Sequence, residues 1–268
     1  MLKTRILTAL VLLPLMLAAL FLFPASIWAG FSWLIVVLAL WEYSRMVKMR
    51  LPQQACYLAL STLAAAAAWM GHRQMNAVEH ALVLAFWLAL VPCWLVRRWT
   101  IPSGAPAWLL GWMLMIPAWF AFLEWRPQPS IRDALALLAV MGLVWVADVA
   151  AYFSGKAFGK RKLAPAISPG KSWEGVYGAV ACVALYVAAI DHFGWLDTGL
   201  PLWALLLLAL PLTAVSVCGD LLESWFKRAA GIKDSSRLLP GHGGVYDRID
   251  SLIAVLAVSN ALRVLGGM

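Results

Sequence analysis

The chain has 268 residues, of which 63% are hydrophobic and 13% are charged, whereas soluble domains average roughly 25% charged residues. So many apolar residues exclude a single soluble core and predict a membrane protein. The formal net charge of +8 is explained by the cytoplasmic excess of Lys and Arg in membrane proteins. We therefore expect no nucleic-acid partner.

Apolar segments long enough to cross a bilayer recur along the whole chain. They are expected at about 4–23, 27–44, 53–70, 78–96, 106–124, 132–153, 174–191, 201–221 and 250–266. The fold class predicted from this pattern is all-α: a polytopic integral membrane protein with about nine transmembrane helices.

The basic residues give this array an orientation. With the N-terminus in the cytoplasm, 17 of the 21 Lys and Arg residues fall in cytoplasmic segments, as the positive-inside rule requires. These include Lys3 and Arg5 at the start of the chain. The exceptions are Arg73, Arg126, Arg132 and Arg263.

Residues 1–140 carry few chemical signals, and we expect them to form a packing and dimer scaffold. Glu42 lies beside Arg45, which indicates a local ion pair at the membrane surface. His72, Glu79 and His80 are expected in a solvated outer loop. Polar residues gather instead in 141–268, which we expect to be the catalytic region, with its site facing the cytoplasm.

The first polar stretch closes the segment expected at 132–153. Asp148, Tyr152 and Lys156 are spaced four residues apart, so a continuing helix would place them on one face. An ionisable residue inside an apolar span usually faces a cavity and a partner. An Asp–Lys pair that only joins two helices is the alternative.

The second stretch, Ser168 to Gly175, opens the next helix. Gly170-Lys171-Ser172 resembles part of a phosphate-binding P-loop, but the earlier glycine is missing and no strand is expected before it. Ser172 still suits a helix start, where free N–H groups and Lys171 would attract an anion. An ordinary helix cap beside a cytoplasmic lysine is the alternative.

The third stretch runs from Asp220 to Asp250 and is the most polar part of the chain. Asp220, Ser224 and Lys227 have helical spacing, and Gly231 should end that helix. Glycines at 241, 243 and 244 would let backbone N–H groups approach an anion. Asp220 and Asp247 flank this loop and could hold Mg²⁺, which takes one or two carboxylates plus substrate phosphates. A basic loop bound to anionic lipid is the alternative.

The residues from Ser224 to Asp250 resemble the signature of the phosphatidate cytidylyltransferase (CDP-diacylglycerol synthase) family of bacteria. The matching positions are Ser224, Lys227, Arg228, Lys233, Asp234, Pro240, Gly241, His242, Gly243, Gly244, Asp247, Arg248 and Asp250. The resemblance extends to Asp148–Lys160 and Ser168–Gly175, and so covers roughly residues 140–266.

The resemblance implies synthesis of CDP-diacylglycerol and pyrophosphate from CTP and phosphatidate, for phospholipid biosynthesis at the bacterial inner membrane. It also implies Mg²⁺, with room for a second divalent ion or a monovalent cation such as K⁺, and a homodimer among membrane lipids. Carried over to this sequence, Asp220 and Asp247 would be metal ligands and, with Lys227 and Arg248, catalytic residues.

Further site residues follow from the same resemblance. Substrate binding is expected of Ser224, Arg228, Lys233, Asp234, Gly241, His242, Gly243, Gly244, Lys171, Ser168, Lys160 and Tyr152. Support is expected from Asp148, Asp250 and Glu223. The function class that competes is a membrane transporter of an anionic nucleotide or metabolite, which would place polar groups near the bilayer midplane in both halves.

Overall fold

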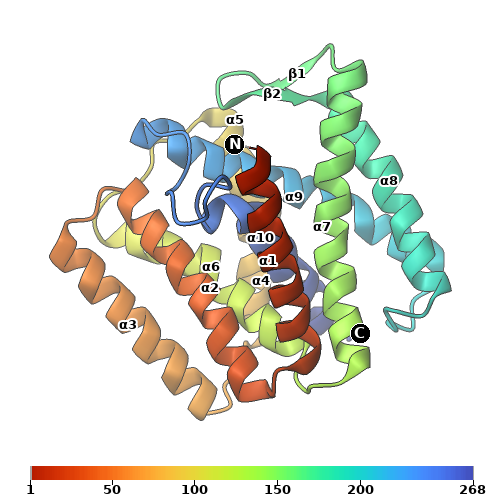
Figure 1. Cartoon of the computed structure of the whole chain (residues 1–268), viewed down its shortest axis with the longest axis horizontal. Helices are drawn as coiled ribbons and strands as arrows, with labels where there is room; N and C mark the ends of the chain where they lie inside the picture. Colours follow the sequence, from red (N-terminus) through yellow and green to blue (C-terminus); the bar gives the residue numbers. More distant parts are fainter. Residues whose placement is uncertain (1, 268) are drawn as a thin grey trace.

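The chain is a bundle of helices joined at one point by a small β-hairpin (Figure 1), seen in a computed structural model that describes residues 2–267, with side chains from residue 7 onward. The side chains of Lys3 and Arg5, used for the orientation, lie outside that part. The helices are α1 (Leu2–Leu22), α2 (Ala25–Met46), α3 (Leu51–Met70), α4 (Ala77–Ala85), the π-helix η1 (Phe86–Leu90), α5 (Val91–Arg97), α6 (Ala105–Trp125), α7 (Ile131–Phe158), α8 (Trp173–His192), α9 (Leu202–Ala230) and α10 (Tyr246–Leu265). The strands are β1 (Lys162–Ala164) and β2 (Ser168–Ser172).

Each apolar segment expected from the sequence falls on a helix, with α4, η1 and α5 together forming the fourth. Within the described residues, six helical segments are long and apolar enough to cross a membrane. They are α2, the α4–α5 run, α6, α7, α8 and α9. This agrees with a polytopic membrane protein. The count of nine and the side of the N-terminus stay predictions, because α1, α3 and α10 fall outside this group.

The β-hairpin between α7 and α8 was not expected, and it is a short addition to a chain that is otherwise helical, as predicted. Lys162 pairs with Ser172, and Ala164 with Ser168, in antiparallel register. The N–H of Ile167 donates to the carbonyl of Ala164 at 3.0 Å and closes the turn. A strand of three residues with no alternation of apolar and polar side chains gives little sequence signal.

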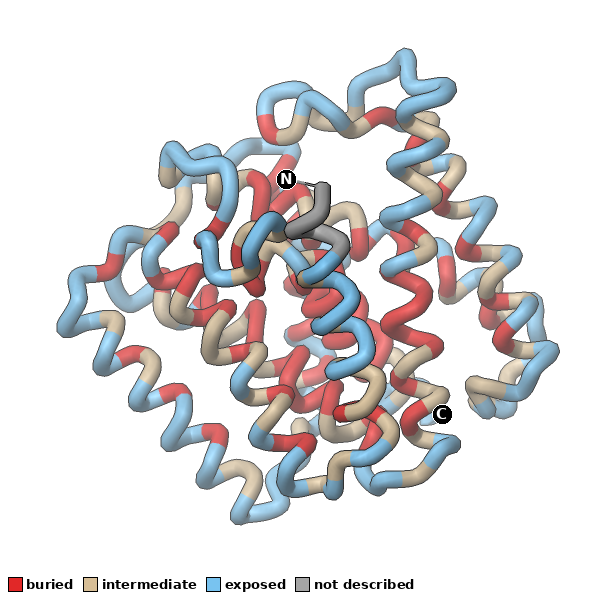
Figure 2. Tube along the Cα trace, in the orientation of Figure 1, coloured by how far each residue is buried: buried red, intermediate tan, exposed pale blue. Residues whose placement is uncertain are grey.

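Helix α10 occupies the middle of the bundle, where it packs against α4, α6, α7 and α9. Residues 251–261 are all buried, on every side of the helix. Figure 2 shows this buried centre, surrounded by helices with exposed outer faces. A helix that is apolar all round belongs inside a bundle, so α10 carries its first residues, which include Asp247, into contact with several neighbouring helices.

The prediction of a solvated outer loop around residues 72–80 is wrong for His80. His72 is exposed, but His80 lies on α4, is buried, and has Nε2 4.0 Å from Oε2 of Glu124. Glu79 accepts the N–H of Asn76 at 2.9 Å, while Asn76 accepts the N–H of Glu79 at 3.0 Å. This capping box starts α4 at Ala77. Glu79 and His80, which were expected in a loop, therefore lie in the first turn of the helix.

Candidate active site

Five of the predicted site residues lie on helix α9: Asp220, Glu223, Ser224, Lys227 and Arg228. The helix continues to Ala230, and Gly231 ends it with a φ of +73°, in the left-handed region that favours glycine. The predicted extension is therefore confirmed. The hydroxyl of Ser224, which is buried, donates to Oδ1 of Asp220 at 3.3 Å. Lys227 forms an ion pair with the buried carboxylate of Glu223.

Helix α7 and the hairpin approach α9 from the other side. Asp148, Tyr152 and Lys156 share one uninterrupted helix, as predicted, and all border the same cavity. Lys171, at the end of β2, has Nζ 2.7 Å from Oδ2 of Asp220. The hydroxyl of Ser172 accepts the N–H of Gly175 at 3.2 Å and so caps α8, as predicted.

A cavity of about 680 Å³ opens among these elements. It receives the carboxylates Asp148 from α7, Asp220 from α9 and Asp250 from α10, together with Lys171 and Ser168 from β2. Its volume lies within the usual range of ligand pockets, roughly 300–1,000 Å³. Three carboxylates from three different helices therefore meet in a space that can hold a small molecule.

A second cavity, of about 560 Å³, lies under the loop between α9 and α10. Lys233, Arg237, His242 and Arg248 border it. Asp234 and Arg248 border both cavities, so the two adjoin. Among the described residues, no carboxylate lies within ion-pair distance of Lys233, Arg237 or Arg248. Cations without partners around a cavity favour an anionic ligand.

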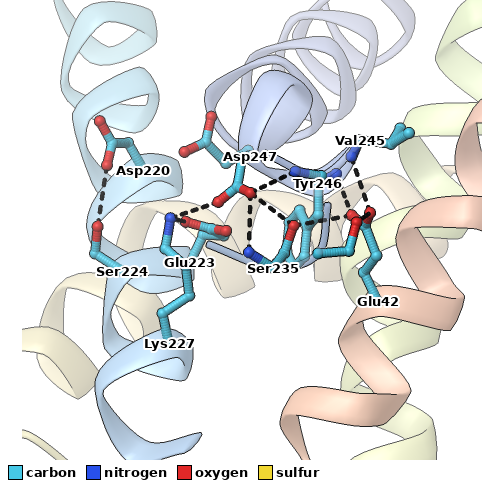
Figure 3. Close-up of polar contacts among 12 residues, drawn as sticks. Glu42, Asp220, Glu223, Ser224, Lys227, Ser235, Val245, Tyr246 and Asp247 are labelled. Carbon is cyan, nitrogen blue, oxygen red and sulfur yellow. Dashed lines mark hydrogen bonds and ion pairs between the residues drawn. The ribbon is translucent and has the colours of Figure 1, made fainter. Parts of the chain in front are cut away.

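Asp247 holds the loop together and also borders the cavity that receives Asp148, Asp220 and Asp250. Its Oδ1 is 2.7 Å from Nζ of Lys227, while Oδ2 accepts the N–H groups of Ser235 at 2.9 Å and Gly244 at 2.8 Å (Figure 3). The hydroxyl of Ser235 donates to the same Oδ2 at 2.8 Å. Burial raises the pKa of Asp247, but its hydrogen bonds, those from Lys227 and Gly244 among them, outweigh burial and hold that pKa at about 2. The carboxylate is therefore ionised at neutral pH.

The glycine loop differs from the expected phosphate cradle. The N–H of His242 donates to the carbonyl of Leu239 at 2.9 Å, and the N–H of Gly244 is taken by Asp247. A side chain on Gly243, whose φ is +82°, would place its Cβ 2.6 Å from Oδ2 of Asp247. These glycines let the chain pass close to a carboxylate, so a phosphate would have to compete for the two N–H groups.

The prediction of an ion pair between Glu42 and Arg45 is wrong. Arg45 is exposed and its guanidinium lies 4.9 Å from the centre of the Trp41 ring. Glu42 is fully buried and accepts hydrogen bonds from the start of α10 and from the loop before it. Glu42 was not predicted to contribute to the site, because its partners are 193–204 positions away in the sequence. The one sequence feature that could have indicated a role was a carboxylate near the end of an apolar helix.

Five predicted site residues border neither of the two cavities: Lys160, Glu223, Ser224, Arg228 and Gly244. Lys160 is exposed and uses its backbone N–H for the carboxylate of Glu174, at 3.1 Å. Nε of Arg228 donates to the carbonyl of Ile167 at 3.4 Å, which attaches the hairpin to α9. Glu223 is buried under Lys227. Their predicted roles in binding and support stay predictions.

The carboxylates of the cavity are suitable ligands for a hard cation that is bound together with substrate phosphates. Asp148, Asp220 and Asp250 border one cavity, and carboxylate oxygens are the ligands that Mg²⁺ prefers. No group of three or more His, Cys, Asp or Glu side chains in the described residues forms a metal cage by itself. Mg²⁺ commonly takes one or two carboxylates and completes its shell with substrate phosphates and water. Asp220 fits this pattern, although Ser224 and Lys171 already contact its two oxygens. Asp247 borders the same cavity, but more protein donors hold its oxygens.

Comparison with known sequences agrees with this geometry. The sequence model of the cytidylyltransferase family matches residues 3–265, and the chain therefore belongs to that family. A protein of Pseudomonas aeruginosa named phosphatidate cytidylyltransferase is 44% identical over 98% of this chain and 97% of its own length. A Haemophilus influenzae protein of the same name is 36% identical over 96% of both chains. One from Staphylococcus epidermidis is 44% identical over 46% of each chain.

Proposed function

We propose that this protein transfers the CMP unit of CTP to phosphatidate and releases pyrophosphate, forming CDP-diacylglycerol. The observation that carries the proposal is the meeting of unpaired cations and carboxylates around two adjoining cavities in the signature region. The family match and the names of the related proteins support the same reaction. They give no support to a transporter.

The reaction joins two phosphates and needs little proton transfer. An anionic oxygen of phosphatidate attacks the α-phosphorus of CTP and forms the new P–O bond of the diphosphate. The bond from that phosphorus to the oxygen bridging to the β-phosphorus breaks, and its electron pair leaves with pyrophosphate. Catalysis therefore depends on positioning and charge neutralisation rather than on a general base.

The residues divide this work between the two cavities. Lys233, Arg237 and Arg248 would neutralise the triphosphate and the leaving pyrophosphate, because none of the three forms an ion pair within the described residues. Lys171, held by Asp220, would direct a phosphate into the carboxylate-lined cavity. Tyr152 and Ser168 border that cavity as well and would orient substrate through their hydroxyls.

We further propose dependence on Mg²⁺. Asp220, with Asp148 and Asp250 on the same cavity, would hold the ion. Bound Mg²⁺ supplies charge neutralisation on the phosphates. Asp247 remains a proposed ligand, and it would serve only if Lys227 moved from its oxygen. A second divalent ion or K⁺ also stays a proposal.

The proposed setting is the bacterial inner membrane, with nine spans, the site towards the cytoplasm and a homodimer as the working unit. A cytoplasmic site is supported by the chemistry, because CTP is water-soluble while phosphatidate presents its headgroup at the membrane surface. The high share of basic residues in the segments around the site agrees with that side.

The test is formation of labelled CDP-diacylglycerol by the purified full chain in detergent, supplied with labelled CTP, phosphatidate and Mg²⁺. We expect lipid product and pyrophosphate in equal amounts, and loss of both when EDTA removes the divalent cations. Absence of a CDP-lipid with any divalent cation would overturn the proposed reaction. Turnover that survives EDTA would overturn the Mg²⁺ proposal alone.

A further inference from the structure

The carboxylate of Glu42, on α2, is surrounded by donors from the far end of the chain. Oε2 accepts the N–H of Tyr246 at 2.6 Å, and Oε1 accepts that of Val245 at 3.0 Å. The hydroxyls of Ser235 and Ser236 donate to it at 3.0 and 2.6 Å (Figure 3). The side chain is 0% exposed, and no Lys or Arg of the described residues forms an ion pair with it.

The two N–H contacts take the place of a helix cap, while the two serine hydroxyls connect Glu42 to the loop. Helix α10 has no side-chain cap of its own at Val245, so its first N–H groups need an outside acceptor. A carboxylate suits that position because the N-terminus of a helix carries partial positive charge. Gly244 completes the fit, since a side chain there would run into Glu42 and Ser235. The start of α10 and the loop before it are therefore fixed against α2.

Ser235 connects Glu42 to the proposed active site. Its hydroxyl lies 3.0 Å from Oε2 of Glu42 and 2.8 Å from Oδ2 of Asp247. A hydroxyl has one proton and can donate to one carboxylate at a time, so the two carboxylates share a single donor. A change at Glu42 must therefore alter the hydrogen bonding of Asp247, which orders the loop and holds Lys227.

We propose that Glu42 is a positioning residue for the nucleotide in the cytidylyl transfer, an inference that rests on the proposed function. It borders neither of the two cavities. It acts by fixing the loop and first turn that carry Lys233, Arg237 and Arg248. The N-terminal helices thus shape the phosphate site as well as packing around it.

The decisive variant is Glu42→Gln, which keeps the shape of the side chain. Its NH₂ group would face an N–H donor, so at least one hydrogen bond to the loop or to α10 is lost. We expect the KM for CTP to rise about tenfold or more, while the KM for phosphatidate stays within about threefold. Steady-state kinetics with each substrate varied in turn gives both values.

A purely structural role predicts a different result. If Glu42 only stabilised the fold, the variant would lower the amount of active enzyme and hence Vmax, with both KM values unchanged. Size-exclusion chromatography and thermal melting in detergent measure the folded fraction. A lower Vmax that matches the lost folded fraction, without a change in the KM for CTP, would overturn the proposal.

Two milder variants cover the case in which Glu42→Gln fails to fold. Glu42→Asp keeps a carboxylate but shortens its reach, and Ser236→Ala removes one donor while leaving the N–H contacts in place. Each should raise the KM for CTP by roughly threefold, less than Glu42→Gln does. An unchanged KM in both variants, with wild-type folding, would also overturn the proposal.

Glu79→Gln is the matched control. Glu79 also accepts a backbone N–H at a helix start, but it lies on α4, next to Arg73 and away from both cavities. We expect both of its KM values to equal those of the wild type.

The same assays distinguish failure of the proposed reaction from failure of the positioning role. If wild-type protein forms no CDP-lipid, the proposed reaction fails. If it does and Glu42→Gln has a normal KM for CTP, the positioning role alone fails.

Discussion

The two ends of the helix bundle use charge in opposite ways. At the end away from the cavities, each of the four arginines has a fixed protein partner. Arg73 pairs with Glu79, Arg126 donates to the carbonyls of Leu20 and Phe23, Arg132 pairs with Asp197 and Arg263 donates to the carbonyl of Glu124. At the other end, Lys233, Arg237 and Arg248 border a cavity without an ion pair in the described chain.

The comparison distinguishes basic residues that contact protein acceptors from basic residues that are available to bind an anionic ligand. Removing a buried cation leaves its protein acceptors unpaired, which lowers stability. Cations that gather around a cavity repel one another and reduce stability, and a bound anion relieves that repulsion. Substitutions at the two ends should therefore change different measured quantities.

The largest effect is expected from Asp220→Asn and Asp247→Asn, which should each lower kcat at least 1,000-fold in the lipid-product assay. Asp220 lies on the carboxylate cavity and makes few protein contacts, so its variant should melt like the wild type. Asp247 accepts four donors, and its variant should melt several degrees lower. Near-normal turnover in either variant would contradict its assigned role.

An intermediate effect, on stability alone, is expected from Arg126→Met at the opposite end. Arg126 is buried, and its guanidinium donates to the carbonyls of Leu20 and Phe23 at the end of α1. Hydrogen bonds to a charged group are worth roughly 1.5–3 kcal/mol each, so the melting temperature should fall by about 5 °C or more. Activity per folded molecule should stay within twofold of the wild type. A raised KM for CTP in this variant would contradict the conclusion that the arginines at this end affect stability and not substrate binding.

The smallest effect is expected from Arg98→Ala. Arg98 is exposed at the end of α5 and has a left-handed backbone, with φ +52°. Alanine has the same Cβ as arginine, so the backbone cost of this conformation is unchanged. Turnover should remain within a few-fold of the wild type in the same assay. A complete loss would show that this part of the N-terminal region contributes directly to substrate binding.

Local features of the site could be predicted because they depend on neighbours in the sequence. The four-residue spacing placed Asp148, Tyr152 and Lys156 on one face, and Gly231 marked the end of α9. Ser172 was recognisable as a helix cap. The family resemblance assigned Lys171 and Asp220, 49 positions apart, to one site, but their contact was seen only in the structure.

Contacts between distant segments could not be predicted. Glu42 had Arg45 one turn away, a plausible local partner, while its true donors belong to α10 and the loop before it. His80 looked polar enough for a loop but is buried opposite Glu124. The glycines of the loop indicated anion binding, whereas their close neighbours are Asp247 and Glu42. In each case the decisive group comes from another helix.

The link between Glu42 and Tyr246 also constrains how the chain is made. These residues are 204 positions apart, and a ribosome adds about 5–20 residues per second. Roughly 10–40 s therefore pass between the synthesis of the buried carboxylate and that of the N–H group it accepts. During that interval Glu42 must stay hydrated or use temporary partners. Helix α10 thus closes the site and satisfies a carboxylate that was made 204 residues earlier.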